Sequence, residues 1–245
     1  MDNNHQLTGR LHSIETFGTV DGPGIRVVLF FQGCPMRCQY CHNRDTWDTA
    51  GGREWTLEDL KQFVLRFKPY MDTSGGGVTA TGGDPVLQHR FITRLFTQLK
   101  EEGVHTALDT SGFCRYEDVK PLIDVTDLVI LDIKAVEPGL HMRLAGQNNA
   151  MILRFADKLR ELNKPVWLRH VLVPGLTDSE EELLAFRRIA LSMPNVQRVE
   201  LLPYHTMGRF KWEEMGLTYP LEGVPDASKE DMTRAYKILN LPSKV

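Results

Sequence analysis

The sequence is poor in cysteine, has no excess of basic residues and contains no long hydrophobic run. Its 245 residues include only four cysteines, which excludes a small fold held together by disulfides. The 29 Lys and Arg residues against 32 Asp and Glu give a net charge of −3. The chain therefore has no overall excess of basic residues with which to bind nucleic acid phosphates. No apolar run approaches the roughly 20 residues of a membrane-spanning helix, and the start MDNNHQLTGR lacks the apolar segment of a signal sequence. We expect a cytoplasmic protein with neither a nucleic-acid nor a membrane partner.

Apolar, β-branched segments alternate with amphipathic segments along the chain. The expected strands cover residues 25–31, 78–81, 105–109, 128–132, 166–171 and 199–202. The expected helices begin after Thr56, which opens a capping box, and cover residues 88–102, 117–124, 151–162, 179–192 and 228–239. This alternation predicts an α/β protein with a parallel sheet, either doubly wound or curled into a barrel.

Six β/α units are too few for a complete eight-stranded barrel. The N-terminal segment and residues 206–225 look rich in loops, and no linker divides the chain. We therefore expect a single domain over residues 1–245.

Polar groups recur at the carboxyl ends of the expected strands. They are Gly82-Gly83-Asp84, Asp109-Thr110, Asp132-Ile133-Lys134, Arg169-His170 and Tyr204-His205. Sites in barrels and in open α/β sheets lie at this edge, so these groups could converge on one cavity. Each motif taken alone could equally be a turn or a helix cap, but their recurrence at five strand ends favours a site.

Three of the four cysteines lie within eight residues, directly after the first strong strand. Cys34, Cys38 and Cys41 have the spacing to wrap one metal centre, and in a reducing compartment this indicates metal or redox chemistry. A 4Fe-4S cluster held by three thiolates would keep one iron open for a substrate or cofactor. A Cys3His zinc site with His42 is a reasonable alternative. Covalent haem attachment at the segment CQYCH and a disulfide are weaker ones.

The C-x3-C-x2-C spacing with Tyr40 before the last cysteine resembles the signature of the radical S-adenosylmethionine superfamily. Further motifs follow in order: TVDGPGIR (19–26), FFQGC (30–34), CHNRDTWD (41–48), GGGVTATGG (75–83), LDIK (131–134) and LLPYH (201–205). Together, over about residues 9–238, they resemble the family of glycyl-radical enzyme activases that act on pyruvate formate-lyase.

The resemblance implies a partial, laterally open barrel of six β/α units and a radical S-adenosylmethionine oxidoreductase. A reduced 4Fe-4S cluster would cleave S-adenosylmethionine to a 5′-deoxyadenosyl radical, which takes a Cα hydrogen from a glycine of pyruvate formate-lyase. The implied partners are the glycine loop of that enzyme and a low-potential electron donor such as flavodoxin. We expect the activase to be a monomer.

The resemblance also assigns residues. It assigns the cluster to Cys34, Cys38 and Cys41, and S-adenosylmethionine to Tyr40, Cys41, His42, Gly82, Gly83, Asp132, Ile133, Lys134 and His205. It assigns a monovalent cation, K⁺ or Na⁺, to Asp109, Thr110, Asp132 and the carbonyl of Ile130, and the substrate peptide to Asp21 and Arg169.

Two features depart from the family pattern. Asp84 stands where the family has Glu after the two glycines, and Cys114 belongs to none of the motifs. We expect Cys114 to be a free, buried cysteine.

Two other functions remain open at this stage. A radical enzyme acting on a small molecule, such as the ring-contracting deazaguanine synthase, would not need the Asp-Gly-Pro-Gly segment that begins at Asp21. A zinc-bound, non-enzymatic binding module would lack iron. Activases of other glycyl-radical enzymes often carry a ferredoxin-like module, for which four cysteines are too few.

Overall fold

The computed structural model describes residues 7–242. Residues 1–6, which are part of the segment expected to lack a signal sequence, lie outside the described residues. The strands are β1 (Thr8–Gly18), β2 (Arg26–Phe31), β3 (Arg53–Thr56), β4 (Gly77–Gly82), β5 (His105–Thr110), β6 (Leu128–Asp132), β7 (Val166–Leu172) and β8 (Val196–Pro203). The helices are α1 (Leu57–Leu65), α2 (Lys68–Ser74), α3 (His89–Glu101), α4 (Tyr116–Asp124), α5 (Pro138–Ala145), α6 (Ala150–Glu161), α7 (Glu180–Ser192), α8 (Arg209–Glu214) and α9 (Lys229–Leu239).

The strands follow the order β3-β1-β2-β4-β5-β6-β7-β8, so the sheet has two edges and does not close. The pairs β2–β4, β4–β5 and β7–β8 are parallel, which confirms the βα rhythm expected from the sequence. All six expected strands are present, as are the helices expected between them.

Two details differ from expectation: the sheet is not parallel throughout, and the N-terminal segment that looks rich in loops contains a strand. β1 is an 11-residue strand that pairs antiparallel with both β2 and β3. Its side chains alternate between more and less buried positions, as in a strand with one face toward solvent. The segment HSIETF carries this two-residue period, but its polar residues make it look like a loop. Residues 206–225 are also not loop throughout, because α8 lies within them.

The chain divides into two compact units, which we describe separately. The first comprises residues 1–35, 46–110 and 114–130, and the second comprises residues 36–45, 111–113 and 131–245. The expected single domain remains a prediction.

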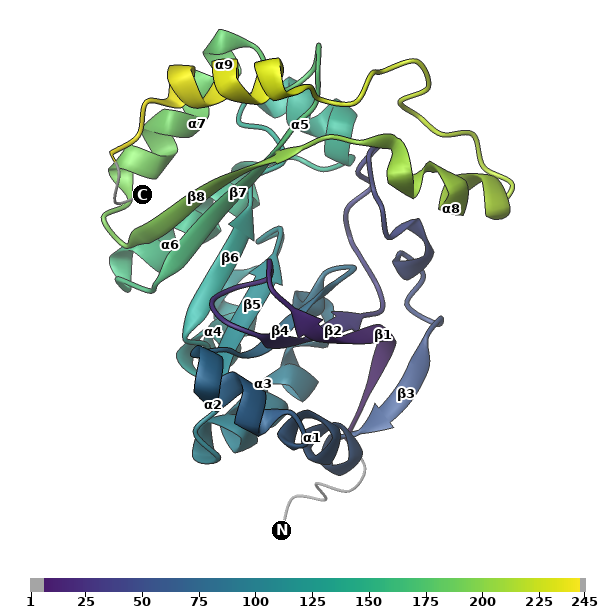
Figure 1. The fold of residues 1–245 in the computed structure, drawn as a ribbon, viewed down its shortest axis with the longest axis vertical. Helices are drawn as coiled ribbons and strands as arrows, with labels where there is room; N and C mark the ends of the chain where they lie inside the picture. Colours follow the sequence, from purple (N-terminus) through teal and green to yellow (C-terminus); the bar gives the residue numbers. More distant parts are fainter. Residues whose placement is uncertain (1–6, 243–245) are drawn as a thin grey trace. The chain divides into compact units, whose positions relative to one another are not determined.

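The core of the first unit lies between its strands and α1, α3 and α4. Val27, Val28 and Leu29 of β2 are fully buried, and α3 contributes Ile92 and Leu95. α3 packs against both α1 and α4 (Figure 1). Thr56 caps α1 by accepting a hydrogen bond from the Asp59 backbone N–H, as its capping-box sequence predicts.

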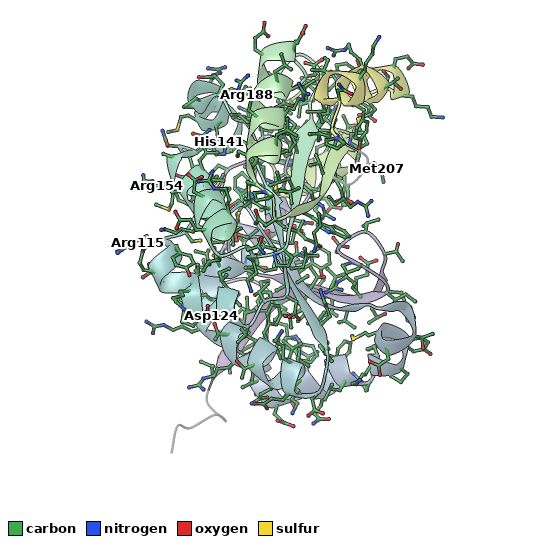
Figure 2. All side chains as sticks on the ribbon, turned by 90° about the vertical axis from the view of Figure 1, so that its left-hand side faces the viewer. Arg115, Asp124, His141, Arg154, Arg188 and Met207 are labelled. Carbon is green, nitrogen blue, oxygen red and sulfur yellow. The ribbon has the colours of Figure 1, made fainter. Side chains whose placement is uncertain are left out.

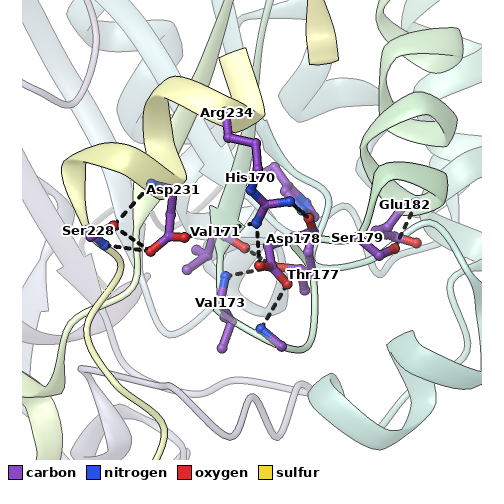
Figure 3. Close-up of polar contacts among 11 residues, drawn as sticks. His170, Val171, Val173, Thr177, Asp178, Ser179, Glu182, Ser228, Asp231 and Arg234 are labelled. Carbon is purple, nitrogen blue, oxygen red and sulfur yellow. Dashed lines mark hydrogen bonds and ion pairs between the residues drawn. The ribbon is translucent and has the colours of Figure 1, made fainter. Parts of the chain in front are cut away.

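In the second unit, α9 lies alongside α7 (Figure 1). Arg154 on α6 and Arg188 on α7 are exposed, as expected for the polar faces of amphipathic helices (Figure 2). Ser179 caps α7, and Ser228 with Asp231 forms a capping box on α9 (Figure 3). No helix within residues 7–242 is long and apolar enough to cross a membrane.

Candidate functional site

The cysteine loop begins in the first unit, at the carboxyl end of β2. Gly33 donates its backbone N–H to the Thr46 carbonyl at 2.7 Å, and its own carbonyl accepts a hydrogen bond from Asp84 N–H at 2.8 Å. Cys34 N–H donates to the Trp47 carbonyl at 3.4 Å. The direction in which the chain leaves β2 is therefore fixed by backbone bonds on both sides.

The rest of the loop belongs to the second unit and is bonded to the end of α5. Arg37 N–H donates to the Ala145 carbonyl at 2.8 Å and Gln39 N–H to the Leu144 carbonyl at 2.9 Å. These carbonyls lie in the last turn of the helix, where no helical partner remains for them. No local sequence pattern indicates this support, because α5 is a short helix that begins at a proline and was not expected.

Cys38 and Cys41 follow this support. Cys41 N–H donates to the Cys38 carbonyl at 3.1 Å, and Trp212 of α8 donates its indole N–H to the Cys41 carbonyl at 3.0 Å. Cys38 is buried, and this burial raises the pKa of its thiol to about 12, although the Lys134 ammonium opposes the rise. In the metal-free protein the Cys38 thiol is therefore protonated at neutral pH, and binding of a metal centre has to displace that proton.

Among residues 7–242, no group of three or more His, Cys, Asp or Glu side chains is arranged to hold a metal ion. Cys34 lies in the first unit and the other two cysteines in the second, so the three-thiolate ligand set remains a prediction. The donor chemistry itself fits an iron-sulfur cluster, since none of the four cysteines forms a disulfide and thiolates are the usual ligands of such clusters.

Asp132, Lys134 and Tyr40, which the resemblance assigns to the cofactor, lie together in the second unit. The Lys134 ammonium donates to Asp132 Oδ2 at 2.6 Å and lies 5.9 Å from the centre of the Tyr40 ring. Burial alone would lower the pKa of Lys134, but the Asp132 carboxylate, with smaller contributions from Tyr40 and Cys38, raises it well above its ordinary value. Lys134 is therefore a permanent buried cation beside Cys38.

Three buried polar atoms on the assigned residues of the second unit have no hydrogen-bond partner in the structure. They are Tyr40 Oη, Asp132 Oδ1 and His205 Nδ1. Buried polar groups are normally satisfied, and three of them on residues of one assigned site fit a polar ligand such as S-adenosylmethionine.

His42 and His205 also pair in the second unit. Their rings lie 4.3 Å apart, and His42 Nε2 donates to the His205 carbonyl at 3.0 Å. Burial lowers the pKa of His42, so this ring is neutral at pH 7. A Cβ on Gly208 would lie 2.5 Å from the His42 ring, so the glycine leaves room for that ring.

The strand ends of the first unit are joined by side chains. Thr81 donates its hydroxyl to Asp109 Oδ2 at 2.9 Å, and Thr110 donates to Asp84 Oδ1 at 2.7 Å. Asp84 is buried and also caps the short 3-10 helix Pro85–Gln88 by accepting from Val86 N–H.

The two glycines at the end of β4 are required by packing. A Cβ on Gly82 would lie 2.4 Å from the Phe31 backbone nitrogen, and one on Gly83 would lie 2.2 Å from the Gly33 carbonyl oxygen. The resemblance implies that these glycines let the backbone approach a cofactor closely. Their contacts with Phe31 and Gly33 give a second reason for glycine at both positions, which does not depend on a cofactor.

Asp21 belongs to the first unit and Arg169 to the second. Asp21 lies before β2, and its carbonyl accepts a hydrogen bond from the Thr79 hydroxyl at 2.6 Å. Arg169 is the fourth residue of β7, where its side chain is 7% exposed and donates to Glu200 Oε2 at 2.7 Å. Glu200 also pairs with Arg198 at 2.9 Å.

Arg26, the last residue of the segment TVDGPGIR (19–26), is a buried residue of the first unit to which the sequence alone assigns no role. It is 0% exposed, and its guanidinium donates to the carbonyls of Pro23 at 3.0 Å and Val78 at 2.6 Å. Burial lowers the pKa of Arg26 to about 10, so it keeps its charge at neutral pH. It holds the turn that carries Asp21 against the first residues of β4.

Cys114 lies in the first unit beyond β5, where it is free, as expected, but only partly buried instead of buried. Burial raises the pKa of its thiol, and the Asp84 and Asp118 carboxylates raise it further. This environment keeps the thiol protonated and unreactive.

Comparison with known proteins gives the family. The family model described as the Radical SAM superfamily matches residues 28–187. The chain is 46% identical over 244 residues to the pyruvate formate-lyase-activating enzyme of Listeria monocytogenes, covering 97% of this chain and 98% of that protein. It is 50% identical over 235 residues to the pyruvate formate-lyase 1-activating enzyme of Escherichia coli K12, covering 95% of this chain and 96% of that protein.

Solved structures agree with this result. A domain of a pyruvate-formate lyase-activating enzyme from Bacteroides vulgatus aligns with a TM-score of 0.57 at 25% identity, covering 67% of this chain and 93% of that chain. SuiB of Streptococcus suis bound to S-adenosylmethionine aligns with a TM-score of 0.62 at 16% identity, covering 87% of this chain and 48% of that chain, and this likeness concerns the fold alone. The α/β fold with an open sheet is thus of the radical SAM type. The chain belongs to the radical SAM superfamily and, within it, to the family of pyruvate formate-lyase-activating enzymes.

Proposed function

We propose that this chain activates pyruvate formate-lyase by generating a glycyl radical on it. The observation that carries this proposal is the 46–50% identity to activating enzymes over nearly the full length of both chains. When bound, the reduced 4Fe-4S cluster and S-adenosylmethionine supply a 5′-deoxyadenosyl radical that abstracts a glycine Cα hydrogen. The protein has to hold both groups, bind the glycine loop of its partner and keep water away from the reacting carbon.

Cys34, Cys38 and Cys41 would hold the cluster through their thiolates. In the second unit, Asp132 and Lys134 would hold S-adenosylmethionine, together with the residues whose polar atoms lack partners, Tyr40 and His205. His42 and Ile133 would contribute further contacts in that unit. In the first unit, the backbone of Gly82 and Gly83 would meet the methionyl group.

A monovalent cation, K⁺ or Na⁺, would lie beside the methionyl carboxylate of the cofactor. Asp109, Thr110, Asp132 and the carbonyl of Ile130 would provide oxygen ligands, which hard cations prefer. The joined ends of β4 and β5 support this assignment for Asp109 and Thr110, because their side chains are already held in place by Thr81 and Asp84.

The remaining parts of the proposal concern partners and location. Reduction of the cluster would come from a low-potential donor such as flavodoxin, since no other redox group is assigned to this chain. We propose that the activase is a cytoplasmic monomer that contacts the glycine loop through Asp21 and Arg169.

The function is tested by anaerobic incubation of the reconstituted enzyme with S-adenosylmethionine, a reductant and pyruvate formate-lyase. We expect a glycyl radical signal in electron paramagnetic resonance and formation of 5′-deoxyadenosine. A variant of pyruvate formate-lyase whose radical-bearing glycine is replaced by alanine should give no signal. Cofactor cleavage without any radical on the native partner would contradict the proposal.

The cluster ligands are tested by iron content after anaerobic reconstitution. Replacing Cys34, Cys38 or Cys41 by Ala should remove most of the bound iron and all glycyl radical formation, because each change removes a thiolate. Cys114→Ala is the matched control and should bind as much iron as the parent. Loss of iron in the control, with full iron in Cys38→Ala, would reverse the assignment.

The cation site is tested by ion exchange. In the parent enzyme, replacing potassium by a large organic cation should weaken S-adenosylmethionine binding by about tenfold, because the methionyl carboxylate then loses its counter-ion. Asp109→Asn should weaken binding similarly and should remove the dependence on the ion. Equal affinity of the parent in both salts would show that no such cation takes part.

The peptide contacts are tested with a glycine-loop peptide of pyruvate formate-lyase. Asp21→Asn and Arg169→Met should keep the cluster and cofactor binding but lose most hydrogen abstraction, while uncoupled cofactor cleavage without peptide survives. Arg198→Met is the control, because Arg198 pairs with the same Glu200 carboxylate but is 56% exposed. Parallel loss of peptide-dependent and uncoupled cleavage would mean that these residues support the fold or the cofactor site instead.

A further inference from the structure

The backbone of Ile133 is held on both sides by β7. Its N–H donates to the Arg169 carbonyl at 2.9 Å, and its carbonyl accepts a hydrogen bond from His170 Nδ1 at 2.8 Å. Because a carbonyl oxygen can only accept, Nδ1 of this ring carries a proton. All three residues belong to the second unit.

The His170 ring is itself fixed. It is 0% exposed and stacks on Phe186 of α7, with ring centres 4.9 Å apart and an interplanar angle of 29°. Its Nε2 lies 3.5 Å from the Thr177 carbonyl. The Thr177 hydroxyl accepts from Val173 N–H at 2.8 Å and donates to the Val171 carbonyl at 2.7 Å, so the turn beneath the ring is bonded back to β7 (Figure 3).

Ile133 stands between the two charged residues of the LDIK motif. Asp132 and Lys134 form an ion pair at 2.6 Å, with side chains only 17% and 14% exposed. Asp132 Oδ1 is buried and has no hydrogen-bond partner in the structure. The Ile133 N–H belongs to the peptide group shared with Asp132, and the Ile133 carbonyl belongs to the peptide group shared with Lys134. The two bonds from β7 therefore fix the peptide groups on both sides of Ile133, and with them the backbone from which the two charged side chains project.

We propose that His170 is a positioning residue for S-adenosylmethionine binding, which acts by fixing the peptide group between Ile133 and Lys134 through its Nδ1–H. This inference rests on the proposed assignment of Asp132 and Lys134 to the cofactor. His170 does not touch the cofactor in this account. Its contribution is to hold Asp132 and Lys134 in the binding geometry before the cofactor arrives, so that no binding free energy is spent on ordering these two side chains.

Two substitutions separate the hydrogen bond from simple packing. In His170→Asn the amide nitrogen takes nearly the place of Nδ1 and can still donate to the Ile133 carbonyl. In His170→Leu a side chain with the same branching has no donor, and the buried carbonyl is left unsatisfied.

The measurement is the dissociation constant of S-adenosylmethionine for the holoenzyme with its cluster oxidised, so that no cofactor is cleaved. We expect His170→Leu to raise it by about tenfold or more and His170→Asn by about threefold or less, with iron content unchanged in both. Steady-state assays should show a raised KM for the cofactor and nearly unchanged kcat in His170→Leu.

His141 offers a matched control within the same unit. It is also 0% exposed, and its Nδ1 lies 2.6 Å from the Gln147 carbonyl, but that carbonyl is outside the LDIK motif. His141→Leu should lower the melting temperature as His170→Leu does, yet leave the cofactor dissociation constant within about threefold of the parent.

A reference variant, Lys134→Met, distinguishes the failures. If Lys134→Met does not weaken cofactor binding, the proposed assignment of the LDIK pair is wrong, whatever His170 does. If it weakens binding while the Asn and Leu variants of His170 behave alike, the positioning role is wrong. If His170→Leu loses its iron, His170→Gln takes its place in the comparison. The Gln amide reaches the position of Nε2 instead of Nδ1, so His170→Gln should weaken cofactor binding where His170→Asn does not.

Discussion

The close approach of two backbones at Gly33 and Gly83 is the constraint on which the cysteine loop depends. The missing Cβ of Gly83 lets its chain lie against the Gly33 carbonyl, which then accepts a hydrogen bond from Asp84 N–H at 2.8 Å. Gly33 immediately precedes Cys34, and its φ of +97° is one that residues with side chains rarely adopt. The first cysteine is thus placed by the end of β4, a strand more than 40 residues further along the chain.

The contacts of Asp84 explain why this shorter acid is tolerated at a position where the family has Glu. The Asp84 carboxylate is buried, accepts the Thr110 hydroxyl at 2.7 Å and caps the 3-10 helix that follows. Capping a backbone N–H two residues ahead suits the short side chain of Asp. The same carboxylate therefore links the ends of β4 and β5 and sets the path of the chain after β4. These functions are structural, and they need no direct contact with a cofactor.

The sequence predicted the regular βα part of this fold well, because buried strands and capped helices have strong local signals. It missed β1 and α5, whose stability depends on partners that no local pattern reveals: β1 needs two antiparallel neighbours, and α5 is short and begins at Pro138. Site motifs were visible as polar residues at strand ends. Their supports were not, since the bonds from His170 to Ile133 and from Trp212 to Cys41 join residues 37 and 171 positions apart.

The turn that carries Asp21 and the loop that carries Cys34 leave opposite ends of β2. Six residues separate these ends, which corresponds to about 20 Å at the rise of a β-strand. The buried guanidinium of Arg26 holds the turn on the first residues of β4, so the distance cannot be shortened by bending the turn toward the cysteines. The proposed contact of Asp21 with the substrate therefore requires an extended segment of about six residues between that contact and the cysteine loop. A flexible glycine-bearing loop of a partner protein meets this requirement.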